Sequence, residues 1–139
     1  MYQITSRWQH QNQVKVEWNI GKRCNYDCSY CPKEIHDNFS PHTDVEILKL
    51  AIDKLCSIGK PIRLSFTGGE PTVHPKFEEL INYIKDKGPE YISVTTNGTR
   101  THTYYESLPV NNFVFSIHFE DPWERVAETI AMFSMFNWK

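Results

Sequence analysis

The sequence predicts an α/β protein, an open and partial (β/α) barrel of about four parallel strand–helix units. Two observations lead to this prediction. Strand-like segments alternate with helix-like segments along the 139-residue chain, which is typical of parallel strands joined by helical crossovers. Within each strand-like segment, apolar and polar residues also alternate with a period of two, so the sheet should have one apolar face and one polar face.

Local signals place the elements in order along the chain. Thr43 and Glu46 form a capping box at the start of the first helix, and Gly59 ends that helix. The second helix has Pro75 in its first turn and Gly88 after its end. We therefore expect strands at 14–20, 62–67, 91–96 and 112–117, and helices at 44–58, 75–87, 102–108 and 121–139.

The polar face is unusual, because helices normally cover both faces of a parallel sheet and keep them apolar. A closed eight-stranded barrel also fills its interior with branched apolar side chains. We therefore expect a curved, open barrel with a polar lumen; the alternative is a polar face that is simply exposed to water. Glu17 and Arg63 fall on this face, where they could pair with each other or bind a substrate.

Composition narrows the class of protein. We expect one domain over 1–139, with an N-terminal extension at 1–13 and a terminal helix at 121–139. The net charge of −2 and the lack of a long basic run give no indication of nucleic-acid binding. No apolar stretch has the length of a membrane span, and no apolar signal core is present, so we expect a cytoplasmic protein.

Polar motifs follow each of the four strands. The carboxyl ends of parallel strands meet at one edge of the sheet, where such folds build their active sites. Three thiolates within eight residues cannot all pair as disulfides, but they can hold a metal or an iron–sulfur cluster. In a four-iron cubane they would leave one iron open to another ligand. The motifs are Cys24, Cys28 and Cys31 in a CxxxCxxC pattern, TGGEP at 67–71, TTNGT at 95–99 and SIHFE at 116–120.

In these motifs the chain resembles the radical S-adenosylmethionine (radical SAM) superfamily. The resemblance implies that Cys24, Cys28 and Cys31 ligate three irons of a [4Fe-4S] cluster, and that the amino and carboxylate groups of S-adenosylmethionine chelate the fourth iron. It also implies a set of contacts to S-adenosylmethionine. These are Tyr30 near the adenine, Gly68, Gly69 and Glu70 at the amino group, and Thr96, Asn97 and Ser116 at the carboxylate or ribose.

The resemblance implies an enzyme that cleaves S-adenosylmethionine reductively, so that a 5′-deoxyadenosyl radical abstracts hydrogen from a substrate that the sequence does not specify. It further implies an electron donor such as a flavodoxin or ferredoxin. The family core has about six strand–helix units, whereas this chain supplies about four. We therefore expect a truncated core, completed by a partner chain or a second copy, unless the chain is a fragment or a minimal form.

Other interpretations of the same residues stay open. The chain could be a non-catalytic cluster or S-adenosylmethionine module, or one half of a split enzyme. The cysteines could instead bind structural zinc, with His36 or His42 as the fourth ligand. Cys56 lies among apolar helix residues and is expected to be a core cysteine. His118 and Glu120 could contact substrate or mark a solvated strand end. The set Trp123, Met132, Phe133, Met135, Phe136 and Trp138 is expected in the core or at a partner surface.

Overall fold

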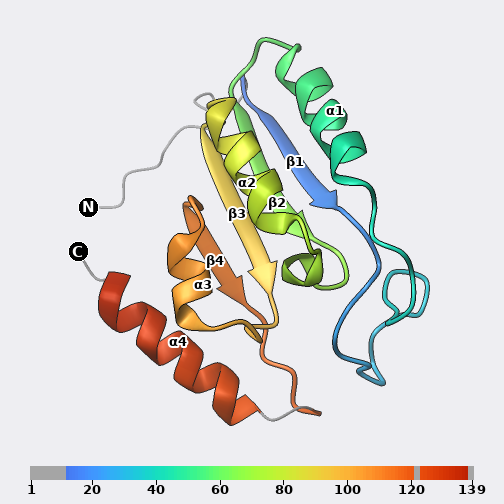
Figure 1. The fold of residues 1–139 in the computed structure, drawn as a ribbon, viewed down its shortest axis with the longest axis vertical. Helices are drawn as coiled ribbons and strands as arrows, with labels where there is room; N and C mark the ends of the chain where they lie inside the picture. The colour runs from blue at the N-terminus through green and yellow to red at the C-terminus, as the bar shows by residue number, and fades with distance from the viewer. Residues whose placement is uncertain (1–11, 121–122, 138–139) are drawn as a thin grey trace, which may run out of the picture.

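The computed structural model describes residues 12–120 and 123–137 and contains one four-stranded sheet (Figure 1). The strand order follows the chain, and each neighbouring pair is parallel. The carboxyl ends of the strands therefore lie side by side, as predicted. The strands are β1 (Val14–Asn19), β2 (Ile62–Thr67), β3 (Tyr91–Thr96) and β4 (Asn112–Phe115).

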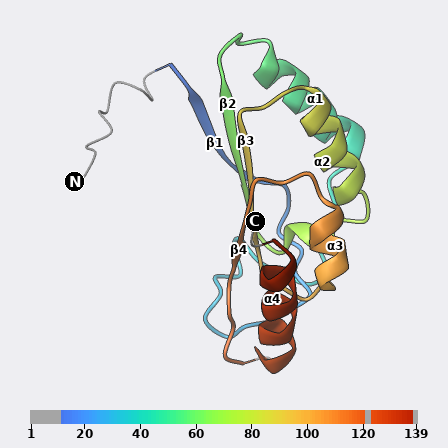
Figure 2. The same cartoon turned by 90° about the vertical axis from the view of Figure 1, so that its left-hand side faces the viewer.

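The helices lie on one side of this sheet, which Figure 2 shows nearly edge-on. This one-sided arrangement, with strand and helix alternating, confirms the predicted partial (β/α) barrel. None of the described helices combines the length and the apolar character that a bilayer crossing needs. The helical elements are α1 (Val45–Cys56), the 3-10 turn η2 (Pro71–Val73), α2 (Phe77–Asp86), α3 (His102–Ser107) and α4 (Trp123–Asn137).

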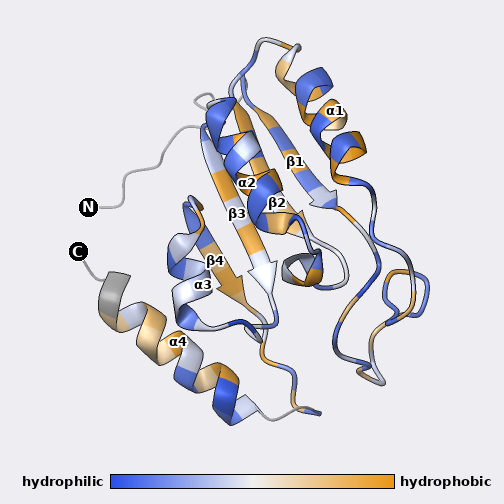
Figure 3. Cartoon of the chain, viewed as in Figure 1, coloured by the Kyte–Doolittle hydropathy of each residue, from blue (hydrophilic) through white to orange (hydrophobic). Residues whose placement is uncertain are grey.

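The core lies between the apolar face of the sheet and helices α1 and α2. Along β3 the hydropathy alternates residue by residue (Figure 3), as the period of two predicts. Phe66 of β2 is fully buried and contacts Trp18 and Phe77, with ring centroids 5.6 and 5.7 Å away. Burial of each such side chain contributes about 1.5–3 kcal/mol to folding. This core fixes the strands whose ends carry the polar motifs.

A second apolar group joins β4 to the last two helices. Phe133 of α4 contacts the rings of Tyr105, Phe113 and Phe115 at 6.3, 5.5 and 5.9 Å. Trp123, Met132 and Met135 of the same helix are exposed. The predicted aromatic and methionine set therefore divides between core and surface. The side chain of Phe136 and all of Trp138 lie outside the described residues. Residues 121 and 122, where this helix was predicted to start, also lie outside them, as does most of the predicted N-terminal extension.

The predicted capping box of the first helix is wrong. Asp44 is the N-cap, and its carboxylate accepts a hydrogen bond from the Glu46 amide at 2.8 Å. Thr43 instead donates its hydroxyl to the Ile20 carbonyl at 3.0 Å, which ties the start of α1 to the end of β1. The predicted stop is confirmed, because Gly59 follows the helix with a φ of 70°.

The prediction that Pro75 lies in the first turn of the second helix is also wrong, because α2 begins at Phe77. The TGGEP segment continues into η2, and His74 before the proline is extended, with a ψ of 123°.

Two strands, β1 and β4, end earlier than the sequence predicted. At Asn19 the side-chain oxygen accepts the Gly21 amide and turns the chain out of β1. Past β4, the Ser116 amide still donates to the Thr96 carbonyl at 2.8 Å.

Candidate functional site

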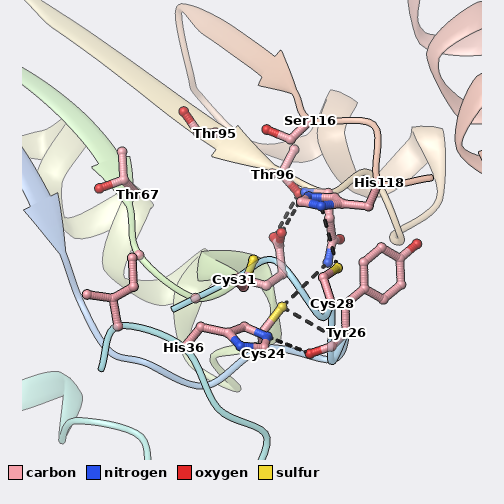
Figure 4. Close-up of a pocket in the computed structure, with 15 residues that line it drawn as sticks. Cys24, Tyr26, Cys28, Cys31, His36, Thr67, Thr95, Thr96, Ser116 and His118 are labelled. Atoms are coloured by element: carbon pink, nitrogen blue, oxygen red, sulfur yellow. Dashed lines mark hydrogen bonds between the residues drawn. The ribbon is translucent and has the colours of Figure 1, made fainter. Parts of the chain in front are cut away.

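A cavity of about 150 Å³ lies at the carboxyl ends of the strands (Figure 4). Every strand end contributes to it, through the cysteine loop after β1 and the segments after β2, β3 and β4. The structure therefore brings together nine of the ten residues that the family resemblance assigned to the cluster or to S-adenosylmethionine. Its lining consists of Cys24, Tyr26, Cys28, Cys31, Ile35, His36, Thr67, Gly68, Gly69, Glu70, Thr95, Thr96, Asn97, Ser116 and His118.

Backbone hydrogen bonds hold the cysteine loop against the end of β2. The Gly69 amide donates to the Gly21 carbonyl at 3.1 Å, and the Glu70 amide donates to the Arg23 carbonyl at 2.9 Å. The Cys24 amide donates to the Asp37 carbonyl at 2.7 Å, so the loop returns alongside its own beginning. These backbone hydrogen bonds hold the loop in place, so that its three thiols line the cavity together with the strand ends.

Side-chain amides connect the same loop to the end of β3. Asn97 donates to the Asn25 side-chain oxygen at 2.8 Å, and Asn25 donates to the Thr99 hydroxyl at 2.9 Å. The Thr99 hydroxyl in turn donates to the Asn97 side-chain oxygen at 2.8 Å. The TTNGT segment therefore positions the cysteine loop, a role that its turn-like sequence alone did not indicate.

The three thiols differ in their exposure to solvent. Cys28 is buried at 1% exposure, whereas Cys24 and Cys31 are partly exposed. Burial raises the pKa of the Cys24 thiol, although the Tyr26 amide, which donates to its sulfur at 3.4 Å, acts in the opposite direction. A nearby positive metal centre would reverse the effect of burial, because it stabilises the thiolate. Cys56 lies on α1, away from this cavity, and packs against the core while remaining partly exposed.

Glu70 is a buried carboxylate that joins two segments. Its Oε1 accepts hydrogen bonds from the Thr72 amide, the Thr72 hydroxyl and the Thr96 hydroxyl, and its Oε2 accepts the Asn97 amide at 2.6 Å. These bonds fix the TGGEP turn and the end of β3 in one arrangement. Glu70 therefore has a structural role in addition to its place in the cavity lining.

Replacement of Glu70 by glutamine should destabilise the chain by about 1–3 kcal/mol. Each carboxylate oxygen faces a backbone amide, of Thr72 or of Asn97. Because the amide group of glutamine has only one acceptor oxygen, either rotamer would set an NH₂ group against a backbone N–H. Urea denaturation measures the loss. The control is Glu78→Gln on the exposed side of α2, which should change stability by about 0.5 kcal/mol or less. Equal midpoints for the two variants would contradict this role for Glu70.

Gly68 and Gly69 are required by packing against the end of β1. A Cβ on Gly68, whose φ is 110°, would lie 2.2 Å from the Asn19 side-chain oxygen. A Cβ on Gly69 would lie 2.3 Å from the carbonyl oxygens of both Lys22 and Arg23. The family resemblance of the sequence implied that these glycines contact the amino group of S-adenosylmethionine. The structure adds a reason within the chain itself, because the cysteine loop could not lie here beside a larger residue.

Tyr30 is the tenth of the residues that the family resemblance assigned and lies outside the cavity lining. Its ring is 55% exposed and stacks on His118 with centroids 6.0 Å apart, and its hydroxyl lies 2.6 Å from His118 Nδ1. Desolvation and the neighbouring Cys28 thiol raise the pKa of Tyr30 to about 12. The same His118 nitrogen lies 3.6 Å from the Cys28 sulfur. His118 therefore joins the cysteine loop to the end of β4.

Glu120, the other strand-end residue of uncertain role, binds within the chain. Its carboxylate accepts the Ser29 amide at 2.8 Å and also the Ser29 hydroxyl. These two bonds hold the pKa of Glu120 below its usual value. The segment after β4 therefore closes over the cysteine loop through two adjacent contacts, one from His118 and one from Glu120.

Comparison with known proteins now identifies the family. The model of the radical SAM superfamily matches residues 18–133, a range that holds the three cysteines and all four strand ends. The chain belongs to the radical SAM superfamily. Members of this superfamily generally use S-adenosylmethionine and a [4Fe-4S] cluster, and the relatives named below are enzymes of varied specificity.

Curated radical SAM relatives match about 60% of the chain. Fe-coproporphyrin III synthase of Methanosarcina barkeri is 40% identical over 85 residues, which cover 60% of this chain and 21% of that protein. S-adenosylmethionine-dependent nucleotide dehydratase of Selenomonas ruminantium is 37% identical over 87 residues, covering 61% of this chain and 30% of the relative. The chain thus spans less than a third of the length of either protein.

A solved radical SAM structure has the same fold. BtrN in complex with AdoMet and 2-DOIA superimposes with a TM-score of 0.67 at 21% identity. The match covers 84% of this chain and 50% of BtrN. At this identity the likeness establishes the architecture, and it agrees with the partial (β/α) barrel described above.

The donor set of the cavity fits the iron–sulfur cluster of the family. Thiolates are the ligands that such clusters prefer, and three line this cavity. His36 is buried beside them with its Nε2 2.7 Å from the Tyr26 carbonyl. Because a carbonyl can only accept, Nε2 carries the proton, and Nδ1 has no hydrogen-bond partner among the described residues. A buried acceptor without a donor suits a site that receives a non-protein group.

The zinc alternative has no geometric support in the described part of the chain. A structural zinc site needs four donors around one point, and no three His, Cys, Asp or Glu side chains there converge on such a point. His42 packs against the His74 ring at 5.1 Å, in a separate small pocket. A four-iron cluster is larger than a single ion, so its ligands stand further apart.

Proposed function

We propose that the chain is the catalytic core of a radical SAM enzyme. In this proposal Cys24, Cys28 and Cys31 hold three irons of a [4Fe-4S] cluster, and S-adenosylmethionine binds the fourth. One observation supports it above all: the three thiols and the ends of β2, β3 and β4 line a single cavity. When bound, the cluster and its ligand would supply one-electron cleavage of the sulfonium carbon–sulfur bond and so a hydrogen-abstracting radical.

The residues of this chain would bind and orient that ligand. We assign Gly68, Gly69 and Glu70, which line the cavity at the end of β2, to the amino group of S-adenosylmethionine. Thr96, Asn97 and Ser116 lie at the ends of β3 and β4, and we assign them to its carboxylate and ribose. Tyr30 stacks on His118, which lines the cavity, and we assign Tyr30 to the adenine side. A flavodoxin-type or ferredoxin-type donor would supply the electron.

Anaerobic reconstitution with iron and sulfide tests the proposal. We expect a brown protein with about four irons per chain, which forms 5′-deoxyadenosine from S-adenosylmethionine when dithionite is added. The Cys56→Ala variant, altered outside the cavity, should form the same product at the same rate. A cluster without any cleavage would contradict the catalytic assignment and would support a binding module or one half of a split enzyme.

Completion of the barrel remains part of this proposal. The two edges of the sheet are β1 and β4, and edge strands present unpaired backbone groups to solvent or to a partner. The exposed side chains Val114 and Ile117 lie at the β4 edge. Further strands, from a partner chain, from a second copy or from a longer form of this chain, would cover that edge and enclose the lumen.

A further inference from the structure

A second hollow lies on the polar face of the sheet, below the cysteine cavity. It encloses about 420 Å³ and is lined from three neighbouring strands. The sequence had singled out two of its residues, Glu17 and Arg63, as facing one lumen, and the structure confirms that they line the same space. The lining residues are Lys15, Val16, Glu17, Arg63, Ser65 and Tyr91.

One row of this hollow carries two positive charges side by side. Lys15 of β1 is in register with Arg63 of β2, and Arg63 is in register with Tyr91 of β3. Neighbouring strands are about 5 Å apart, so the two cations repel each other on the same face. Among the ion pairs of residues 12–120 and 123–137, none includes Lys15 or Arg63. An anion between them would remove this repulsion.

The arginine of this row is already oriented. Its guanidinium lies over the Tyr91 ring, 4.2 Å from the ring centroid. Stacking of this kind limits the rotamers of the side chain while leaving its N–H groups free to bind an oxyanion in the plane of the guanidinium. Glu17 and Ser65 form the next row toward the cysteine cavity. A negative group would therefore favour the Lys15–Arg63 row over the Glu17 row.

The hollow and the cysteine cavity share the polar side of β2. Arg63 and Ser65 line the hollow, and Thr67 lines the cavity. Thr67 lies four positions after Arg63 along the strand, a distance of about 13 Å. A small molecule of that length could place one end at the two cations and its other end beside the cluster site.

We propose that the Lys15–Arg63 row is a subsite for an oxyanion, a phosphate or carboxylate group, at the far end of the substrate. This inference rests on the proposed function, and it specifies the substrate as an anionic small molecule that extends along the polar face. Glu17 and Ser65 would meet its middle, where they suit hydroxyl groups. The oxyanion subsite is independent of the residues that hold the cluster.

Nuclear magnetic resonance of the isotope-labelled full chain tests the subsite. Inorganic phosphate, added at constant ionic strength against sodium chloride, should shift the Arg63 Nε–Hε signal and the amides of Lys15 and Arg63. Arg63→Gln and Lys15→Gln should each weaken phosphate binding about tenfold, the loss of one charged hydrogen-bond partner. Lys85→Gln, which removes an exposed cation on the helical side, should leave the affinity unchanged.

The outcomes of this titration distinguish the kind of oxyanion and test the subsite itself. Tighter binding of phosphate than of acetate would identify a phosphorylated substrate, and the reverse order would identify a carboxylate. Equal shifts with chloride alone, or unchanged affinity in both row variants, would overturn the subsite. Because this titration requires neither cluster nor S-adenosylmethionine, it is separate from the 5′-deoxyadenosine assay. Phosphate binding without cleavage would contradict the proposed function alone, and cleavage without phosphate binding would contradict the subsite alone.

Discussion

The Cys28→Ala variant should lose the iron–sulfur cluster, with iron falling from about four atoms per chain to near zero after reconstitution. Cys28 is the most buried of the three cavity thiols, at 1% exposure, so water cannot readily replace its sulfur as a ligand. A cluster with only two protein thiolates would have two open irons and would be lost to chelators. Iron analysis and the visible absorption of the cluster measure the effect.

The control for this variant is within the same chain. Cys56→Ala removes a thiol of similar chemistry from α1, outside the cavity, and should retain the full iron content. It also separates loss of a ligand from non-specific binding of iron by free thiols. Unchanged iron in the Cys28 variant would remove this residue from the ligand set.

The Gly69→Ala variant should unfold at a much lower urea concentration, with a loss of about 3 kcal/mol or more. The added Cβ would lie 2.3 Å from two backbone carbonyl oxygens, those of Lys22 and Arg23. Backbone atoms cannot rotate away as a flexible side chain can. The cysteine loop would have to move off the end of β2, breaking the hydrogen bond from the Gly69 amide to the Gly21 carbonyl.

Gly21→Ala provides the matched control. Gly21 lies in the same loop, but a Cβ there would meet nothing within 4 Å, and its φ is not positive. Its stability should stay within about 0.5 kcal/mol of the parent chain. Denaturation midpoints that fall equally for both variants would show that the loop does not pack as described. If only Gly69→Ala loses iron as well as stability, the packing of the loop also controls the cluster site.

The fold could be predicted because its signals are local and periodic. Apolar residues at every second position define the sheet, and Gly59 ends the first helix by its positive φ. The capping residue could not be chosen in the same way. Thr43 and Asp44 are both good caps, and the choice depends on the contact of Thr43 with the Ile20 carbonyl, 23 residues earlier. Pro75 was misplaced because the TGGEP segment adds a 3-10 turn before the helix.

In the candidate site, too, the sequence predicted what depends on local motifs and missed what depends on contacts between distant residues. The motif residues reach one cavity because parallel strands align their carboxyl ends. His118 could have been weighted more heavily, since it lies two residues after Ser116 and so on the same side of the chain. The sequence named His36 only as a possible zinc ligand, with His42 as the alternative. His36 lines the cavity because Asp37 pairs with the start of the cysteine loop, a contact that only the folded chain specifies.

The central claim is that three thiols of this cavity hold a cluster whose remaining iron binds S-adenosylmethionine. Electron paramagnetic resonance of the reduced, reconstituted chain tests it most directly, recorded with and without S-adenosylmethionine. We predict a cluster signal whose g-values change when the ligand is added, because its amino and carboxylate groups would coordinate the open iron. Superimposable spectra at saturating ligand would contradict the claim.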